Sequence, residues 1–187
     1  MSMYDDEPTP ALGAVIEQAR GSLPFALIHG EALVTCAAWA LGESGVTPVD
    51  LGTEWAGLVD AAEPFVLHDS LCPMTPGSFI TECLERAVAS ATVVVGMRPV
   101  TDTVKSVVDG IVGETVDREG LLTICSPVVL PAGVVAALTE LPSLDFTELV
   151  AVLAARFPVD YVEAPPQARR VGSLDDLALL AALTGPV

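Results

Sequence analysis

The sequence predicts an α/β fold, a three-layer sandwich around a mostly parallel sheet, because strand-like and helical segments alternate along the chain. Two short apolar runs, residues 64–67 and 92–96, are typical of strands that are buried on both faces. Between them, residues 79–88 place apolar side chains at helical spacing. A strand, a helix and a strand in this order form a βαβ unit.

The segments before this unit are less regular. Residues 13–16 form an apolar run, but the sequence leaves open whether this run forms the first strand. Residues 31–41 carry apolar side chains on one helical face, which predicts a helix. Residues 47–62 show no clear pattern. We expect Thr75 to cap the helix of the βαβ unit, with Pro76 at its first position.

A hairpin interrupts the alternation after the βαβ unit. Asp109 and Gly110 stand between two β-branched runs, which is a strong hairpin signal. A strand is then expected over residues 121–125, ending at Ser126. The remaining pattern predicts helices over residues 131–141 and 144–157, the second capped by Ser143, then a strand over residues 159–162 and a last helix that Ser173 opens and that runs to residue 183.

Length and charge limit the class of protein. The 187 residues favour a single domain, which we place at residues 11–187, after a short disordered leader over residues 1–10. Asp and Glu number 25 against 8 Lys and Arg, so the net charge is −17. An acidic chain repels phosphate backbones and anionic lipids, so no nucleic acid and no membrane surface is expected as a partner. No apolar run approaches the ~20 residues of a spanning helix, and the leader lacks the basic region of a secretory signal, so we expect a cytoplasmic protein.

The cysteines and histidines do not indicate a zinc site. None of the four cysteines forms a C-x-x-C pair, and His29 and His68 lie in different segments. We interpret the cysteines as reduced, partly buried thiols.

Polar residues follow three of the expected strands. His68 and Asp69 come directly after residues 64–67, residues 98–103 follow the next strand, and Ser126 follows residues 121–125. Ligands of open α/β sheets bind beyond the carboxyl ends of the strands. We therefore expect the functional site at this edge of the sheet.

Four motifs in this region resemble those of one family. Residues 67–73 read LHDSLCP where the family has V-H-D-A-A-R-P, and residues 99–105 keep its P-V-x-D-T-x-K intact. Residues 115–121 keep T-V-D-R-x-x-L, and residues 169–180 are similar to I-K-V-T-x-P-E-D-L-A-L-A. In this order around a hairpin, the motifs resemble the methylerythritol phosphate cytidylyltransferase family, which joins CTP to methylerythritol 4-phosphate in isoprenoid synthesis.

The resemblance implies a Rossmann-like nucleotide-diphospho-sugar transferase fold with a protruding hairpin arm at about residues 101–125. In this family the arm crosses to a second subunit, which implies a homodimer. Asp69 matches the position that helps to hold the nucleotide and its Mg²⁺. The resemblance assigns substrate contacts to four positions: Thr103, Arg118, Ser126 and Arg170.

The chain departs from the family where the triphosphate binds. The family wraps the triphosphate with a glycine-rich loop, A-A-G-x-G-x-R-M-G, followed by P-K, and residues 18–23 are only QARGSL here. Leu23 stands in place of the lysine, Cys72 in place of the arginine of the histidine-aspartate motif, and Arg20 is the one possible remnant of the loop's cations. Each close cation offsets roughly 4 kcal/mol of Coulomb energy at 4 Å and an effective dielectric near 20.

Three hypotheses follow, and the sequence leaves open whether the chain is an enzyme. The first is a cytidylyltransferase-like protein with impaired or lost CTP-dependent transfer, which binds a sugar phosphate or nucleotide weakly or not at all. As a non-catalytic regulatory protein it could also pair with an active paralogue through its arm. The second is an active, Mg²⁺-dependent nucleotidyltransferase with a simplified nucleotide site. The third is an unrelated α/β domain whose motif matches arise by chance.

Overall fold

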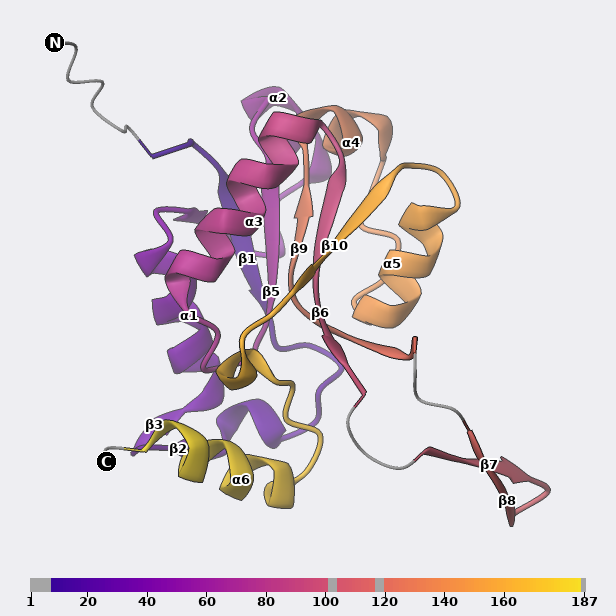
Figure 1. Cartoon of the computed structure of the whole chain (residues 1–187). Coiled ribbons are helices and arrows are strands. Elements are labelled where there is room, and N and C mark those ends of the chain that lie inside the picture. The colour runs from indigo at the N-terminus through magenta and orange to yellow at the C-terminus, as the bar shows by residue number, and fades with distance from the viewer. Residues whose placement is uncertain (1–7, 101–103, 117–119, 186–187) are drawn as a thin grey trace, which may run out of the picture.

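The centre of the protein is a six-stranded sheet with the strand order β10-β6-β9-β5-β1-β4 (Figure 1). This computed structural model describes residues 8–100, 104–116 and 120–185. All strands of the sheet run parallel except β9, which is antiparallel to both of its neighbours, so the mostly parallel sheet of the prediction is confirmed. The strands are β1 Leu12–Ile16, β4 Thr47–Pro48, β5 Phe65–Asp69, β6 Val93–Pro99, β9 Leu122–Leu130 and β10 Val159–Glu163.

Helices cover both faces of this sheet (Figure 1). Successive residues of β5 show the alternation, because Phe65 and Leu67 pack on the face of α2, α4 and α5, whereas Val66 packs on the face of α1 and α3. A third apolar cluster joins α6 to the segment before α1, at the carboxyl ends of the strands. The helices are α1 Leu33–Glu43, α2 Trp55–Ala61, α3 Gly77–Ser90, α4 Ala132–Ala137, α5 Phe146–Ala154 and α6 Leu174–Thr184, with short 3-10 turns η1 Leu23–Phe25 and η2 Pro166–Ala168.

The strand predicted over residues 121–125 is shorter than the observed strand β9. The strand continues past Ser126 to Leu130, so Ser126 lies within a strand and not beyond its end. Pro127 hid this continuation because proline is rare inside a sheet. Pairing with β6 is irregular here, and a Cβ on Gly96 would lie 2.5 Å from the Ser126 carbonyl oxygen, so the two backbones approach closely.

Other element boundaries also differ from the prediction. Thr75 does not cap α3; its hydroxyl donates to the Cys72 carbonyl, and Pro76 occupies the cap position. Asp145, and not Ser143, caps α5, because the Asp145 carboxylate accepts from two backbone N–H groups of the first turn. The cap at Ser173 is confirmed. Residues 31–41 begin with β3 Glu31–Ala32, which pairs with β2 Leu27–Ile28, and residues 47–62 hold β4 and α2.

The predicted hairpin is present and lies apart from the sheet (Figure 1). Its strands are β7 Val104–Val108 and β8 Ile111–Val116, and both turn residues, Asp109 and Gly110, have positive φ. The leader prediction falls mainly on residues 1–7, which lie outside the described residues. Within the described part of the chain, no helix has the length and apolar character needed to cross a bilayer.

Candidate functional site

Asp69 forms the centre of the candidate site. It is the last residue of β5, and its side chain is only 1% exposed. The Arg20 Nε donates to Asp69 Oδ1 at 2.9 Å, and the Arg170 Nε donates to Asp69 Oδ2 at 3.1 Å. The structure therefore brings together three residues that the sequence analysis singled out separately, from the ends of β1 and β5 and from the segment before α6.

Arg20 is held on every side. Its Nη2 donates to the Leu144 carbonyl at 2.8 Å, its Nη1 donates to the Gln18 carbonyl at 3.1 Å, and its guanidinium lies 5.8 Å from the ring centre of Phe146. The Arg20 side chain is 4% exposed. This arginine thus links the loop after β1 to β5 and to the start of α5.

The donors around Asp69 do not match a resident Mg²⁺ site. Asp69 Oδ1 also accepts from the Leu71 N–H at 3.0 Å, so both carboxylate oxygens already face hydrogen-bond donors. Mg²⁺ is held in proteins by oxygen ligands in octahedral geometry. Within the described residues, no group of three His, Cys, Asp or Glu side chains is arranged so that it could hold a metal ion.

Ser126 and His68 form a buried hydrogen-bond network with the backbone of Asp69. Ser126 Oγ accepts from the Asp69 N–H at 2.9 Å and shares a hydrogen bond with His68 Nδ1, and all three side chains are buried. Burial lowers the pKa of His68 to about 4, although the Asp69 carboxylate acts in the opposite direction. Among the described residues, His68 Nε2 and Ser70 Oγ have no hydrogen-bond partner. His68 is therefore a neutral, internal residue at neutral pH.

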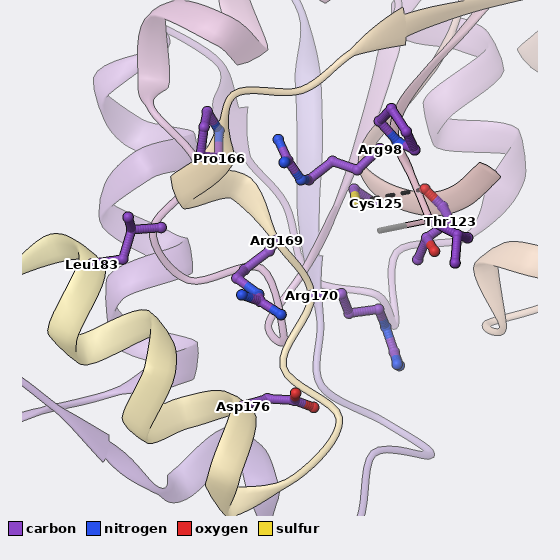
Figure 2. Close-up of a pocket in the computed structure, with 10 residues that line it drawn as sticks. Arg98, Thr123, Cys125, Pro166, Arg169, Arg170, Asp176 and Leu183 are labelled. Carbon is purple, nitrogen blue, oxygen red and sulfur yellow. Dashed lines mark hydrogen bonds between the residues drawn. The ribbon is translucent and has the colours of Figure 1, made fainter. Parts of the chain in front are cut away.

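A pocket of about 260 Å³ lies next to this centre, where β6 and β9 approach η2 and α6 (Figure 2). Arg98 comes from the end of β6, and Arg169 and Arg170 come from the segment after η2. In the view of Figure 2, Cys125 and Thr123 lie beside Arg98, and Asp176 lies below Arg169. The residues lining the pocket are Arg98, Pro99, Val100, Thr123, Cys125, Pro166, Arg169, Arg170, Asp176 and Leu183.

The sequence analysis placed Arg98 in the segment 98–103 at the expected edge of the sheet and Arg169 in the last family motif, but it assigned no ligand contact to either. A signal was present, because two adjacent arginines are unusual in a chain with only 8 basic residues. Arg169 and Arg170 line the same pocket as Arg98 because of the path that the chain takes between β10 and α6. No local sequence pattern encodes this path.

Cys72 and Cys125 form a buried thiol pair at this pocket. A hydrogen bond from Cys72 lowers the pKa of Cys125, with Arg98 and Arg170 acting in the same direction. Burial and the same contact raise the pKa of Cys72. Cys125 is therefore the more easily ionised thiol, and it lines the pocket.

The other predicted site residues can be placed only in part. Thr103 and Arg118 lie outside the described residues. Leu23 is partly buried and packs against the apolar cluster that joins α6 to the segment before α1, where a lysine side chain would meet apolar neighbours.

Comparison with known proteins decides the family. Residues 54–184 match the family model described as IspD, 2-C-methyl-D-erythritol 4-phosphate cytidylyltransferase. The chain belongs to this family. The match excludes the hypothesis of an unrelated α/β domain whose motifs agree by chance. A comparison with curated proteins finds no match.

Solved cytidylyltransferase structures share the fold. The 2-C-methyl-D-erythritol 4-phosphate cytidylyltransferase of Thermus thermophilus superposes with a TM-score of 0.66 at 20% identity, over 91% of this chain and 96% of that one. The 4-diphosphocytidyl-2C-methyl-D-erythritol synthase of Anaerococcus prevotii gives 0.65 at 13% identity, over 95% and 99%. Another 4-diphosphocytidyl-2C-methyl-D-erythritol synthase structure gives 0.67 at 15% identity, over 94% and 98%.

Proposed function

We propose that this member of the cytidylyltransferase family has lost, or strongly reduced, CTP-dependent cytidylyl transfer. The observation that carries the proposal is the position of Arg20. It is the remaining candidate for a triphosphate clamp in the loop after β1, and it is buried against Asp69, Leu144 and Phe146. A cation used in this way is not available to an incoming triphosphate.

Releasing Arg20 would be costly. It would remove one of the two guanidiniums beside a fully buried carboxylate, and breaking a buried ion pair costs about 3–5 kcal/mol. That cost is comparable to the roughly 4 kcal/mol that one cation gains from a phosphate charge at 4 Å and an effective dielectric of 20. Little net gain is left to bind CTP.

The range of the family match supports the same proposal. The matched range begins at residue 54 and leaves out β1 and the loop that follows it. In that loop, residues 17–23 carry Arg20 as their one Arg or Lys. The segment that would hold the triphosphate thus lies outside the matched range.

Calorimetry with CTP and MgCl₂, followed by a product assay with methylerythritol 4-phosphate, tests the proposal. We expect no saturable CTP binding at micromolar concentration and no cytidylylated product. Product formation that Arg170→Ala abolishes would instead establish the alternative, an active nucleotidyltransferase with a simplified site and a Mg²⁺ requirement.

We also propose that the hairpin mediates assembly with a second copy of the chain or with an active paralogue. Val107, Val108, Ile111 and Val112 are 63–72% exposed at its tip. Burying such side chains stabilises an interface by ~25 cal/mol per Å² of apolar area.

Sedimentation velocity tests this assembly. We expect a dimer for the wild type and a monomer for Ile111→Lys, whereas Val152→Lys, at an exposed position of α5, leaves the dimer intact. A wild type that stays monomeric alone but forms a complex with an active paralogue would indicate the heteromeric assembly. A monomer under both conditions would exclude the arm as an interface.

A further inference from the structure

Two cysteines from different parts of the chain meet beside the Asp69 centre. Cys72 lies in the turn after β5, and Cys125 lies within β9. Both are free thiols and almost completely buried, and the Cys72 side chain donates a hydrogen bond to the Cys125 sulfur. A disulfide joins cysteines whose Cβ atoms lie about 3.5–4.5 Å apart, so it forms between side chains that are already neighbours.

Hydrogen bonds outside the thiols hold these two cysteines next to each other. The Asp69 N–H donates to Ser126 Oγ at 2.9 Å, and Ser126 directly follows Cys125 in β9. The Cys72 N–H donates to the Asp69 carbonyl at 2.9 Å. The turn that carries Cys72 is thus bound to the strand that carries Cys125, so the fold itself keeps the two thiols in contact.

Cys125 has the surroundings of a reactive thiol. It lines the pocket of about 260 Å³ together with Arg98 and Arg170, and Figure 2 shows it beside Arg98. As a thiol it donates to the Thr123 carbonyl at 3.6 Å, whereas its thiolate accepts from the Cys72 thiol and from the backbone N–H of Arg170. A thiolate in an electropositive site is the form that peroxides oxidise. Hydrogen peroxide is close to water in size, so a pocket of this volume admits it.

The other two cysteines of the chain have different surroundings. Cys83 lies on the apolar face of α3, and burial raises its pKa to about 12. Burial and the charge of Glu31 raise the pKa of Cys36 in α1. Neither of these two described cysteines lines the pocket. They therefore serve as internal controls for the reactivity of the thiol pair.

We propose that Cys72 and Cys125 are a peroxide-reactive pair that forms a disulfide within the chain. The Cys125 thiolate attacks one oxygen of hydrogen peroxide and becomes a sulfenic acid, while the O–O bond breaks and the second oxygen leaves as hydroxide, which takes up a proton to give water. The Cys72 sulfur then attacks the Cys125 sulfur, the S–S bond forms and the S–O bond breaks, and hydroxide leaves with the Cys72 proton as a second water. The peroxide gains the two electrons that the thiol pair loses.

Electrostatics set the order of these two steps. Burial raises the pKa of Cys72, and its hydrogen bond to Cys125 and the charges of Asp69 and Cys125 raise it further. The charge on Cys125 disappears when that sulfur is oxidised, so part of this effect is lost at the stage where Cys72 has to react. The family motif has an arginine at the position of Cys72, so the pair is not part of the motif. The proposal does not depend on the loss of cytidylyl transfer, because the covalent state of the thiols is measured without nucleotide.

Peptide mass spectrometry of the full chain tests the proposal. The reduced protein is exposed to hydrogen peroxide, quenched with catalase, alkylated with iodoacetamide in urea and digested without reductant. We expect a linked pair of peptides that contains Cys72 and Cys125 and that dithiothreitol separates, while Cys36 and Cys83 are recovered alkylated. The linked pair should form roughly tenfold faster, or more, in the folded protein than in protein unfolded in urea before the peroxide is added, because the native contact holds the two sulfurs in place.

Variants separate the roles of the two thiols. Cys72→Ser should leave a sulfenic acid at Cys125, which dimedone traps, and Cys125→Ser should leave Cys72 as a thiol. Cys36→Ser, outside the pocket, should not change the rate of crosslinking. If a serine variant at the buried pair fails to fold, the wild-type measurement still decides, because it involves no substitution. Equal oxidation of all four cysteines, disulfides between copies of the chain, or equal rates of crosslinking in folded and unfolded protein would overturn the proposal.

Discussion

Arg20 and Asp69 lie 49 residues apart in the sequence and form a buried ion pair, with 2.9 Å between Nε and Oδ1. The pair joins the loop after β1 to the end of the neighbouring parallel strand β5, at the edge of the sheet where ligands of such folds bind. At this position the carboxylate of Asp69 and the guanidinium of Arg20 pair with each other.

The first prediction concerns the stability that this pair provides. Arg20→Ala leaves Asp69 with one guanidinium and leaves the Leu144 carbonyl without the Arg20 donor. We expect the free energy of unfolding, measured with urea, to fall by about 3 kcal/mol. Arg86→Ala is the matched control, because it breaks an exposed pair with Asp160 and should cost at most about 1 kcal/mol. An equal loss of unfolding free energy in the two variants would show that the buried pair stabilises the fold no more than the exposed pair does.

The second prediction concerns acid stability through His68. Its pKa is about 4 when folded against the ordinary 6.5, so the unfolded state binds more protons between these two values. Stability therefore falls as the pH drops from 6.5 to 4, and His68 contributes roughly 3 kcal/mol to this fall. Urea titrations at several pH values should give a shallower dependence for His68→Asn than for the wild type. Identical slopes would mean that folding does not change the pKa of His68.

The third prediction concerns the thiol at the pocket. Cys125 has a lowered pKa and lies beside Arg98 and Arg170, whereas burial and Glu31 raise the pKa of Cys36. For each cysteine, peptide mass spectrometry gives the ratio of labelling by the anionic reagent iodoacetate to labelling by the neutral reagent iodoacetamide. We expect this ratio to be higher at Cys125 than at Cys36. Arg98→Gln should reduce this preference. If the preference is the same at both cysteines, the pocket does not attract anions.

The fourth prediction concerns the contact between β6 and β9. A Cβ on Gly96 would lie 2.5 Å from the Ser126 carbonyl oxygen, and that backbone cannot move without disturbing the buried strand. We expect Gly96→Ala to lower the free energy of unfolding by about 1–3 kcal/mol or more. Gly133→Ala is the control, because a Cβ there meets nothing within 4 Å and alanine favours the helix α4.

The fold was predictable where burial alone determines the pattern. Strand β5 is buried at all five positions, and its first three residues form an apolar run, whereas the buried His68 and Asp69 were predicted to lie beyond its end. Helix α3 follows with apolar spacing. An apolar run does not reveal, however, whether the strand runs parallel or antiparallel to its neighbours. The antiparallel course of β9 through Ser126 follows from its place between β5 and β6, which the local sequence does not encode.

The candidate site was predictable in the same partial way. Asp69 was found because it follows the apolar run over residues 64–67, and the structure extends the strand to include it. Arg20 and Arg170 were found through the family motifs. The ion pairs among the three depend on tertiary contacts over 49 and 101 residues, so the sequence could not show that they satisfy one another. The same holds for Arg98 and Arg169, whose common pocket forms only when η2 and α6 pack against the end of β6.

The reversed strand has one mechanical consequence. Because β9 runs against its neighbours, the chain leaves the sheet at Arg98, passes through the hairpin and returns opposite Arg98 at Thr123. The root of the arm thus forms one side of the pocket, and η2, the segment after it and α6 form the rest. The arm and the pocket therefore share the same two strands, β6 and β9, as their support.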